Sequence, residues 1–166
     1  SQEALDKAVA LIDKNIERQV SRGKATAEDK AAAMGRIKTT LKLADLGKTD
    51  LVIEAATERE TVKQAIFEDL LPHLKHDTIL TSNTSSISIT RLASRTDRPE
   101  KFMGFHFMNP VPAMKLVEII RGIATEEDTY QVIKGLAEKL GKTPVTAEDF
   151  PAFIVNRILL PMINEA

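Results

Sequence analysis

Apolar residues recur every three or four positions at the beginning of the chain: Leu5, Val9, Ile12, Ile16 and Val20. Charged and polar residues fill the positions between them, which predicts an amphipathic helix that ends near Gly23. Thr26 followed three residues later by Asp29 resembles an N-terminal cap. This pair predicts a second, short helix that continues to about Met34 and is broken by Gly35.

From about residue 50 the pattern changes to short apolar runs that alternate with longer helical segments. Strands are expected at 51–53, 78–81, 102–107, 116–120 and 144–146, and helices at 60–74, 89–93, 125–140 and from 153 onward. The helix at 125–140 would be capped by Thr125. This alternation is typical of an α/β fold in which helices cover a largely parallel sheet. We find no internal repeat and no low-complexity linker.

The 166 residues carry 23 Lys and Arg against 24 Asp and Glu, a formal net charge of −1. A nucleic-acid or membrane-surface protein would normally carry a basic excess, so we expect neither partner. No uncharged stretch reaches the roughly 20 apolar residues that a spanning helix needs. The absence of cysteine excludes disulfides, thiolate metal ligands and cysteine nucleophiles, and we expect no metal. With no targeting pattern, the expected location is the cytoplasm.

Two polar clusters follow predicted strands, where parallel sheets bind their ligands. The first, EAATERETVK, spans residues 54–63. The second, TSNTSS, spans residues 81–86 and offers hydroxyls and amides directly after an apolar strand. A solvated turn is the alternative interpretation of TSNTSS.

A third candidate site is His106, which lies between two phenylalanines in FHFMNPVP. A lone histidine in an apolar strand is more often a core residue than a catalytic one. Glu118 lies within the aliphatic run LVEII, and a buried carboxylate needs a partner. We predict that Glu118 orients His106 and stabilises its charged form, with the two side chains roughly 2.6–3.2 Å apart. The alternative is an outward-facing Glu118 on an edge strand.

Four segments together resemble the 3-hydroxyacyl-CoA dehydrogenase family, and most closely its bacterial 3-hydroxybutyryl-CoA members: TSNTSSISIT, GFHFMNPVPAMKLVEII, LGKTPVT and FIVNRILLPMINEA. The resemblance runs in order from about Leu51 to the last residue. It implies an NAD-binding Rossmann domain, incomplete here, over residues 1–148. Residues 149–166 would begin an all-α C-terminal domain that forms a homodimer in the full-length protein.

The resemblance also implies oxidation of the 3-hydroxyl of an acyl-CoA substrate to a ketone, or the reverse reduction. By motif, His106 would be the general base and Glu118 its orienting partner. Ser85 would bind the substrate oxygen close to the nicotinamide, and Asn156 would complete the polar surroundings of the reacting carbon. We predict that Ser85 lies within a substrate's width of His106.

For NAD, the resemblance assigns Glu58, Lys63, Ser85 and Asn109 as contacts. Two departures from the family pattern accompany it. No G-x-G occurs, so we expect the Rossmann sheet to lack its first strands and the isolated segment to be inactive. Ala152 also stands where the family usually has glycine.

Two alternatives remain open, one among related enzymes and one from a different class of protein. A related sugar-acid dehydrogenase of the lambda-crystallin type would share the core around His106. A non-catalytic Rossmann-like fragment would keep the sheet and bind no cofactor.

Overall fold

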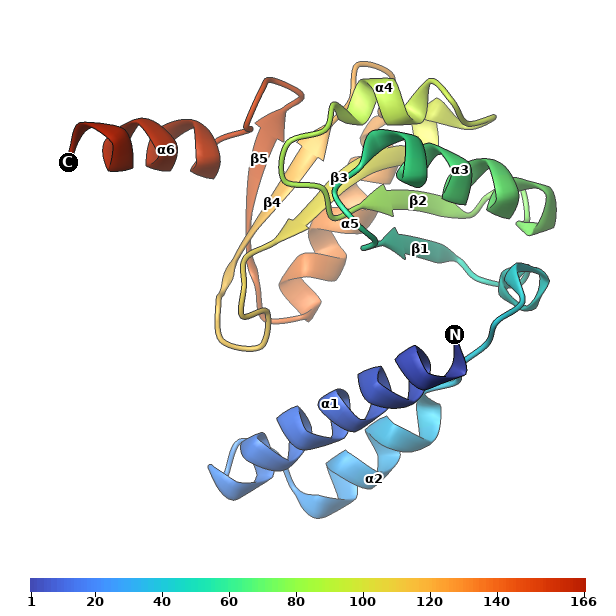
Figure 1. Cartoon of the computed structure of the whole chain (residues 1–166), viewed down its shortest axis with the longest axis vertical. Coiled ribbons are helices and arrows are strands. Elements are labelled where there is room, and N and C mark those ends of the chain that lie inside the picture. The colour runs from blue at the N-terminus through green and yellow to red at the C-terminus, as the bar shows by residue number, and fades with distance from the viewer. The chain divides into compact units, whose positions relative to one another are not determined.

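The computed structural model describes residues 1–166, which form two compact units, Ser1–Asp45 and Leu46–Ala166. The helices are α1 (Gln2–Ser21), α2 (Ala27–Arg36), α3 (Glu60–Leu70), α4 (Ile89–Ala93), α5 (Glu127–Lys139) and α6 (Val155–Glu165). The strands are β1 (Leu51–Glu54), β2 (Ile79–Ser82), β3 (Phe102–Phe107), β4 (Leu116–Arg121) and β5 (Thr143–Glu148). Figure 1 labels these elements. No helix is both long and apolar enough to cross a membrane.

In the first unit α1 and α2 form a helical pair. The Lys30 ammonium lies 2.9 Å from an Asp13 carboxylate oxygen and 2.8 Å from one of Glu17, which links the two helices. The Thr26–Asp29 capping box is present. The prediction that Gly35 ends this helix is wrong, because α2 continues to Arg36. A glycine costs a helix only about 1 kcal/mol, and in the last turn it need not stop the helix.

The second unit is built on a five-stranded sheet with the order β1-β2-β3-β4-β5. All neighbouring strands are parallel except β3 and β4, which pair antiparallel. The predicted mostly parallel sheet is therefore confirmed. The parallel strands β1, β2 and β3 place their carboxyl ends at one edge, where Glu54 pairs with Ser82.

Helices cover both faces of the sheet (Figure 1). Along β3, Phe102 packs with α3 and α4, whereas Met103 and Phe105 pack with α5. Because side chains alternate along a strand, His106 projects to the same face as Phe102. Gly104 lies between them, and a Cβ there would come 2.8 Å from Ile120 on β4. This close approach requires glycine.

Two helix ends differ from the prediction. The helix predicted to run to residue 74 ends at Leu70 and is followed by a 3₁₀ turn over Leu71–His73. The predicted cap Thr125 is wrong, since the N-cap of α5 is Glu126. The Thr125 hydroxyl instead donates to the Phe102 carbonyl at 2.7 Å and so connects the segment before α5 to β3.

A tight turn connects β5 to α6. Ala152 and Phe153 both adopt left-handed backbone conformations, with φ of 66° and 50°. Asp149 anchors the turn, since it accepts hydrogen bonds from the backbone amides of Ile89 and Thr90 at 2.9 and 2.8 Å. Beyond the turn, α6 has no buried residue and extends away from the sheet (Figure 1). The domain boundary at residue 148 remains a prediction.

Candidate active site

His106 and Glu118 are directly opposite each other in the β3–β4 register. The His106 Nδ1 atom lies 2.7 Å from Glu118 Oε2, and both side chains are buried. The predicted contact and its distance are therefore confirmed, and the alternative of an outward-facing Glu118 is excluded. Directly opposite residues of an antiparallel pair project to the same face, which brings the carboxylate to the imidazole.

The second carboxylate oxygen of Glu118 binds the beginning of α6. Glu118 Oε1 accepts hydrogen bonds from the backbone amides of Ile154 and Val155, each at 2.9 Å. Burial raises the pKa of this carboxyl, but the hydrogen bonds from His106 and from the two amides outweigh burial and leave the pKa below its ordinary value. Glu118 is therefore an ionised partner for His106.

Ser85 lies on the other side of the imidazole, with its Oγ 3.0 Å from His106 Nε2. Because a carboxylate only accepts hydrogen bonds, Glu118 favours the tautomer of His106 that carries the proton on Nδ1. His106 Nε2 is then a proton acceptor that receives the Ser85 hydroxyl. The prediction that Ser85 lies within a substrate's width of His106 is confirmed.

Glu58 holds the loop that carries Ser85. Its Oε1 accepts from the hydroxyl of Thr84 at 2.5 Å, from the amide of Ser85 at 2.8 Å, and from the amide and hydroxyl of Ser86, each at 3.1 Å. Burial raises the pKa of Glu58, but these hydrogen bonds and the nearby Lys63 ammonium leave it lowered overall. The TSNTSS segment is thus a structured loop and not a solvated turn.

Two asparagines also fix the geometry of this loop. Asn83 Oδ1 accepts from the Phe107 amide at 2.8 Å, which ties the loop to the end of β3. The Asn156 Nδ2 group donates to the Ser85 carbonyl at 3.2 Å from the first turn of α6. The structure therefore brings Asn156 together with Ser85, His106 and Glu118.

Lys63 lies in the interior. Its ammonium donates to both oxygens of Glu54 at 2.9 and 3.0 Å and lies 3.6 Å from Glu58 Oε2. Lys63 is fully buried, and Glu54 is almost so. The structure thus joins Lys63 to Glu58, and it places the Lys63 ammonium against two carboxylates.

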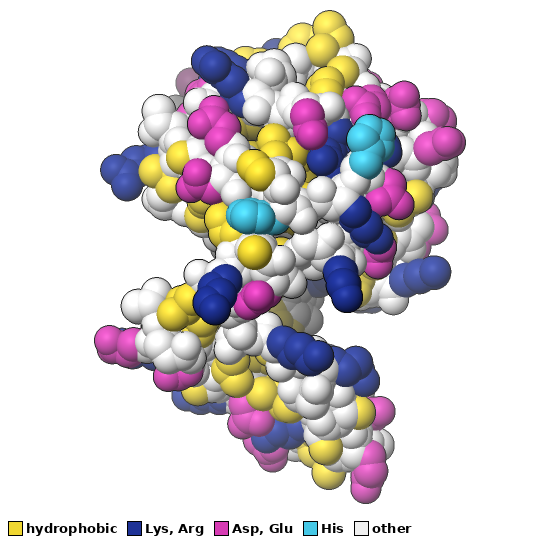
Figure 2. Space-filling model, turned by 90° about the vertical axis from the view of Figure 1, so that its right-hand side faces the viewer, with side chains coloured by type: hydrophobic (Ala, Val, Ile, Leu, Met, Phe, Trp, Pro, Cys, Tyr) yellow, Lys and Arg dark blue, Asp and Glu magenta, His cyan; other side chains and the backbone are white.

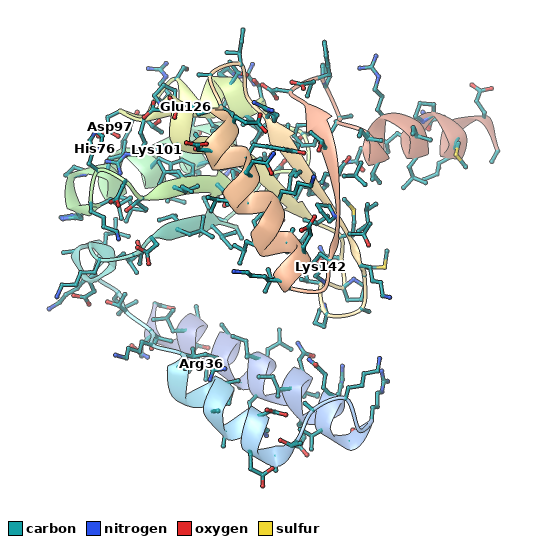
Figure 3. All side chains as sticks on the ribbon, turned by 180° about the vertical axis from the view of Figure 1, so that it is seen from behind. Arg36, His76, Asp97, Lys101, Glu126 and Lys142 are labelled. Atoms are coloured by element: carbon teal, nitrogen blue, oxygen red, sulfur yellow. The ribbon has the colours of Figure 1, made fainter.

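Asn109 is exposed in the connection between β3 and β4. Lys142, which follows α5, donates to the carbonyls of Val111 and Met114 in this connection. Figure 3 labels Lys142 near the end of α5, beside the connection. The structure does not bring Asn109 into hydrogen-bond contact with His106 or Ser85.

The face shown in Figure 2 carries both signs of charge, with basic and acidic side chains interspersed. This distribution agrees with the net charge of −1.

Three residues of this arrangement were not identified from the sequence. Glu54 ends an apolar strand, the same signal that identified Glu118, and its partner Lys63 lies nine residues later. Asn83 lies within the TSNTSS motif. Lys142 lies within LGKTPVT, where the sequence contains no signal of a contact with the distant β3–β4 connection.

Known proteins similar to this chain identify its family. The family model for the NAD-binding domain of 3-hydroxyacyl-CoA dehydrogenase matches residues 1–150. A 3-hydroxybutyryl-CoA dehydrogenase of Bradyrhizobium diazoefficiens is 57% identical over all 166 residues, which cover 57% of that protein. The α subunit of the fatty acid oxidation complex of Psychrobacter cryohalolentis is 45% identical over 159 residues, 96% of this chain and 22% of that protein.

Among solved structures, the (S)-3-hydroxybutyryl-CoA dehydrogenase of Ralstonia eutropha superposes with a TM-score of 0.96 at 47% identity. The superposition covers 99% of this chain and 58% of that one. The fold is that of a Rossmann-type NAD-binding domain. The chain belongs to the 3-hydroxyacyl-CoA dehydrogenase family, within its NAD-binding domain. It spans a little under three fifths of the length of each of these two 3-hydroxybutyryl-CoA dehydrogenases.

The cofactor of this family domain is NAD. The residues present fit the end of NAD that carries the nicotinamide and its ribose. The Glu58 side chain is 40% exposed, and its Oε2 receives no hydrogen bond, which leaves an acceptor for a ribose hydroxyl. Ser85 offers a hydroxyl beside His106. The 166 residues contain no G-x-G for the pyrophosphate.

Proposed function

We propose that this chain supplies the catalytic residues for NAD-dependent oxidation of the 3-hydroxyl of a 3-hydroxyacyl-CoA, with 3-hydroxybutyryl-CoA as substrate, or for the reverse reduction. The observation that carries the proposal is the continuous line of contacts from Ser85 Oγ through His106 to Glu118, at 3.0 and 2.7 Å. Such a line provides a proton acceptor oriented by a buried carboxylate. The names of the relatives support the choice of substrate.

In the oxidation, the substrate hydroxyl gives its proton to His106 Nε2 as the carbon–oxygen double bond forms. The chemistry that bound NAD would supply is an acceptor for the hydride of the same carbon. Glu118 stabilises the imidazolium that results, because its carboxylate is ionised and lies 2.7 Å from Nδ1. In the reduction His106 returns the proton to the oxygen.

Ser85 and Asn156 position the substrate in this proposal. The substrate oxygen would lie beside His106 Nε2 and receive the hydrogen bond of the Ser85 hydroxyl, which the imidazole accepts in the absence of substrate. Asn156 holds the Ser85 carbonyl from α6 and so fixes this side of the site. Glu58 and Asn109 would contact the cofactor.

We further propose that the protein is a homodimer and that it is located in the cytoplasm. The exposed apolar side chains of α6, such as Ile158 and Ile163, support a subunit contact. In the cytoplasm both NAD and acyl-CoA thioesters are available.

The test is NADH consumption with acetoacetyl-CoA and, separately, with acetoacetate, which has no CoA group. The protein is produced together with any sequence that its gene encodes on either side of these residues. We expect turnover of the CoA thioester to exceed that of the free acid by at least about 100-fold in kcat/KM, because remote binding energy positions the reacting end. Equal use of both compounds, or no reduction of either, would contradict the proposal.

A further inference from the structure

Glu54 and Lys63 form a buried ion pair that the proposed chemistry does not use. Both carboxylate oxygens of Glu54 accept from the Lys63 ammonium, and Oε2 also accepts from the Ser82 hydroxyl at 2.6 Å. A buried ion pair contributes little net stability, because desolvation of both charges offsets their attraction. Stability is therefore a weak reason for this pair to lie at the carboxyl ends of β1 and β2.

The pair is connected to the reacting atoms through Glu58. The Lys63 ammonium lies 3.6 Å from Glu58 Oε2, while Glu58 Oε1 binds the amides of Ser85 and Ser86. Ser85 in turn lies against His106 Nε2. A displacement of Glu58 would therefore move Ser85 relative to the imidazole.

We propose that Glu54 and Lys63 are positioning residues for Ser85 that act through Glu58. Glu54 holds the ammonium on its own two oxygens, so Lys63 favours the ionised form of Glu58 from 3.6 Å without drawing it into direct contact. Without Glu54, the nearest anion to the buried ammonium is Glu58. The ammonium would then compete with the loop amides for that carboxylate.

The first test measures amide hydrogen exchange at Ser85 and Ser86 by NMR, without cofactor or substrate. The variant is Glu54→Gln/Lys63→Met, which removes both charges together and leaves no unpaired buried ion. The control is Glu60→Gln/Arg91→Met, which removes an ion pair between α3 and α4 that does not contact Glu58. We expect exchange at both amides to accelerate about tenfold in the variant, because Glu58 loses the ammonium that lies 3.6 Å from its Oε2, and to stay unchanged in the control. Unchanged exchange in the variant would overturn the proposal.

If the double variant does not fold, Ser82→Ala is measured in the same way, because it removes only one hydrogen bond from Glu54. We expect a smaller acceleration at the same two amides. Equal exchange in Ser82→Ala and the unmodified protein would then overturn the proposal.

A second test is kinetic and rests on the proposed function. In the double variant we expect kcat for acetoacetyl-CoA to fall about tenfold, with KM changed less than about threefold. Ser85→Ala should cost less in the double variant than in the unmodified protein, because both changes disturb the same contact. Equal costs in the two backgrounds would overturn the positioning role. If the unmodified protein showed no turnover, the proposed function would fail, whereas the exchange measurement would still decide the positioning role.

Discussion

The Glu118 carboxylate divides its two oxygens between His106, at 2.7 Å from Nδ1, and the first backbone amides of α6, at 2.9 Å. One side chain therefore connects the imidazole in the sheet to the helix that carries Asn156. Because Asn156 donates back to the Ser85 carbonyl, the beginning of α6 is bound to both sides of the site. The position of α6 and the geometry around His106 depend on each other.

Glu118→Gln should remove both the charge of the carboxylate and the acceptor that it offers to His106 Nδ1. The amide keeps an oxygen for the α6 amides but cannot stabilise an imidazolium. We expect kcat to fall about 10²–10⁴-fold with a small change in KM, the range typical of general acid–base catalysis. Steady-state kinetics with acetoacetyl-CoA and NADH measure the effect. A loss below about threefold would show that the Glu118 charge does not support catalysis.

The Glu118→Gln variant also tests how the free energy of unfolding depends on pH. The pKa of Glu118 is lower in the folded protein than its ordinary value of about 4.3, so its contribution is fully present above that pH. As the pH falls through and below this value, the unfolded state binds the proton first and the contribution is lost. The difference in free energy of unfolding between the unmodified protein and Glu118→Gln should therefore narrow as the pH falls from about 6 to about 3. This interval spans the ordinary pKa of about 4.3. Urea unfolding measures it, and a constant difference would contradict the assignment.

The secondary structure was largely predictable because apolar periodicity distinguishes the strands from the helices. Of the site, the contact of His106 with Glu118 could be predicted because a carboxylate within an aliphatic run needs a partner. Glu54 ends the apolar run LVIE in the same way. It was missed because the family resemblance assigned its partner Lys63 to the cofactor, and periodicity does not reveal that α3 turns this lysine inward. The predicted break at Gly35 was wrong because a glycine in the last turn costs a helix only about 1 kcal/mol. The predicted cap at Thr125 was wrong because a tertiary contact, with the Phe102 carbonyl, takes its hydroxyl.

Ser85→Ala should remove the hydroxyl that lies against His106 Nε2. We expect kcat to fall about 10–100-fold, because one well-placed hydrogen bond at the reacting oxygen is lost. Ser94→Ala is the matched control, since its hydroxyl only donates to the Arg91 carbonyl at the end of α4. Equal activity of both variants and the unmodified protein would remove Ser85 from the site.

Ala152 has a φ of 66°, a conformation that costs a residue with a Cβ about 1 kcal/mol or more. Ala152→Gly removes this strain but makes the unfolded chain more flexible. We expect a net stabilisation of up to about 1 kcal/mol. Ala65→Gly, at an exposed position in the middle of α3, should instead destabilise the protein by about 1 kcal/mol. Thermal unfolding compares the two, and destabilisation of similar size in both would refute the strain at Ala152.

Lys142 donates to two carbonyls of the connection that carries Asn109, so it should fix that loop. We expect Lys142→Met to raise KM for NADH severalfold, about 3–10-fold, since a loosened loop costs ordering on binding. Lys139→Met, near the end of α5, is the control. An unchanged KM in Lys142→Met would show that this loop does not contact the cofactor.

In the proposed oxidation, His106 Nε2 takes the proton of the substrate hydroxyl. The most direct measurement is kcat for oxidation of 3-hydroxybutyryl-CoA by His106→Gln, whose amide occupies similar space and accepts no proton. The proposal predicts a loss of at least about 100-fold with the fold retained. Turnover within about threefold of the unmodified protein would contradict it, since a general base in the proposed role contributes far more than that.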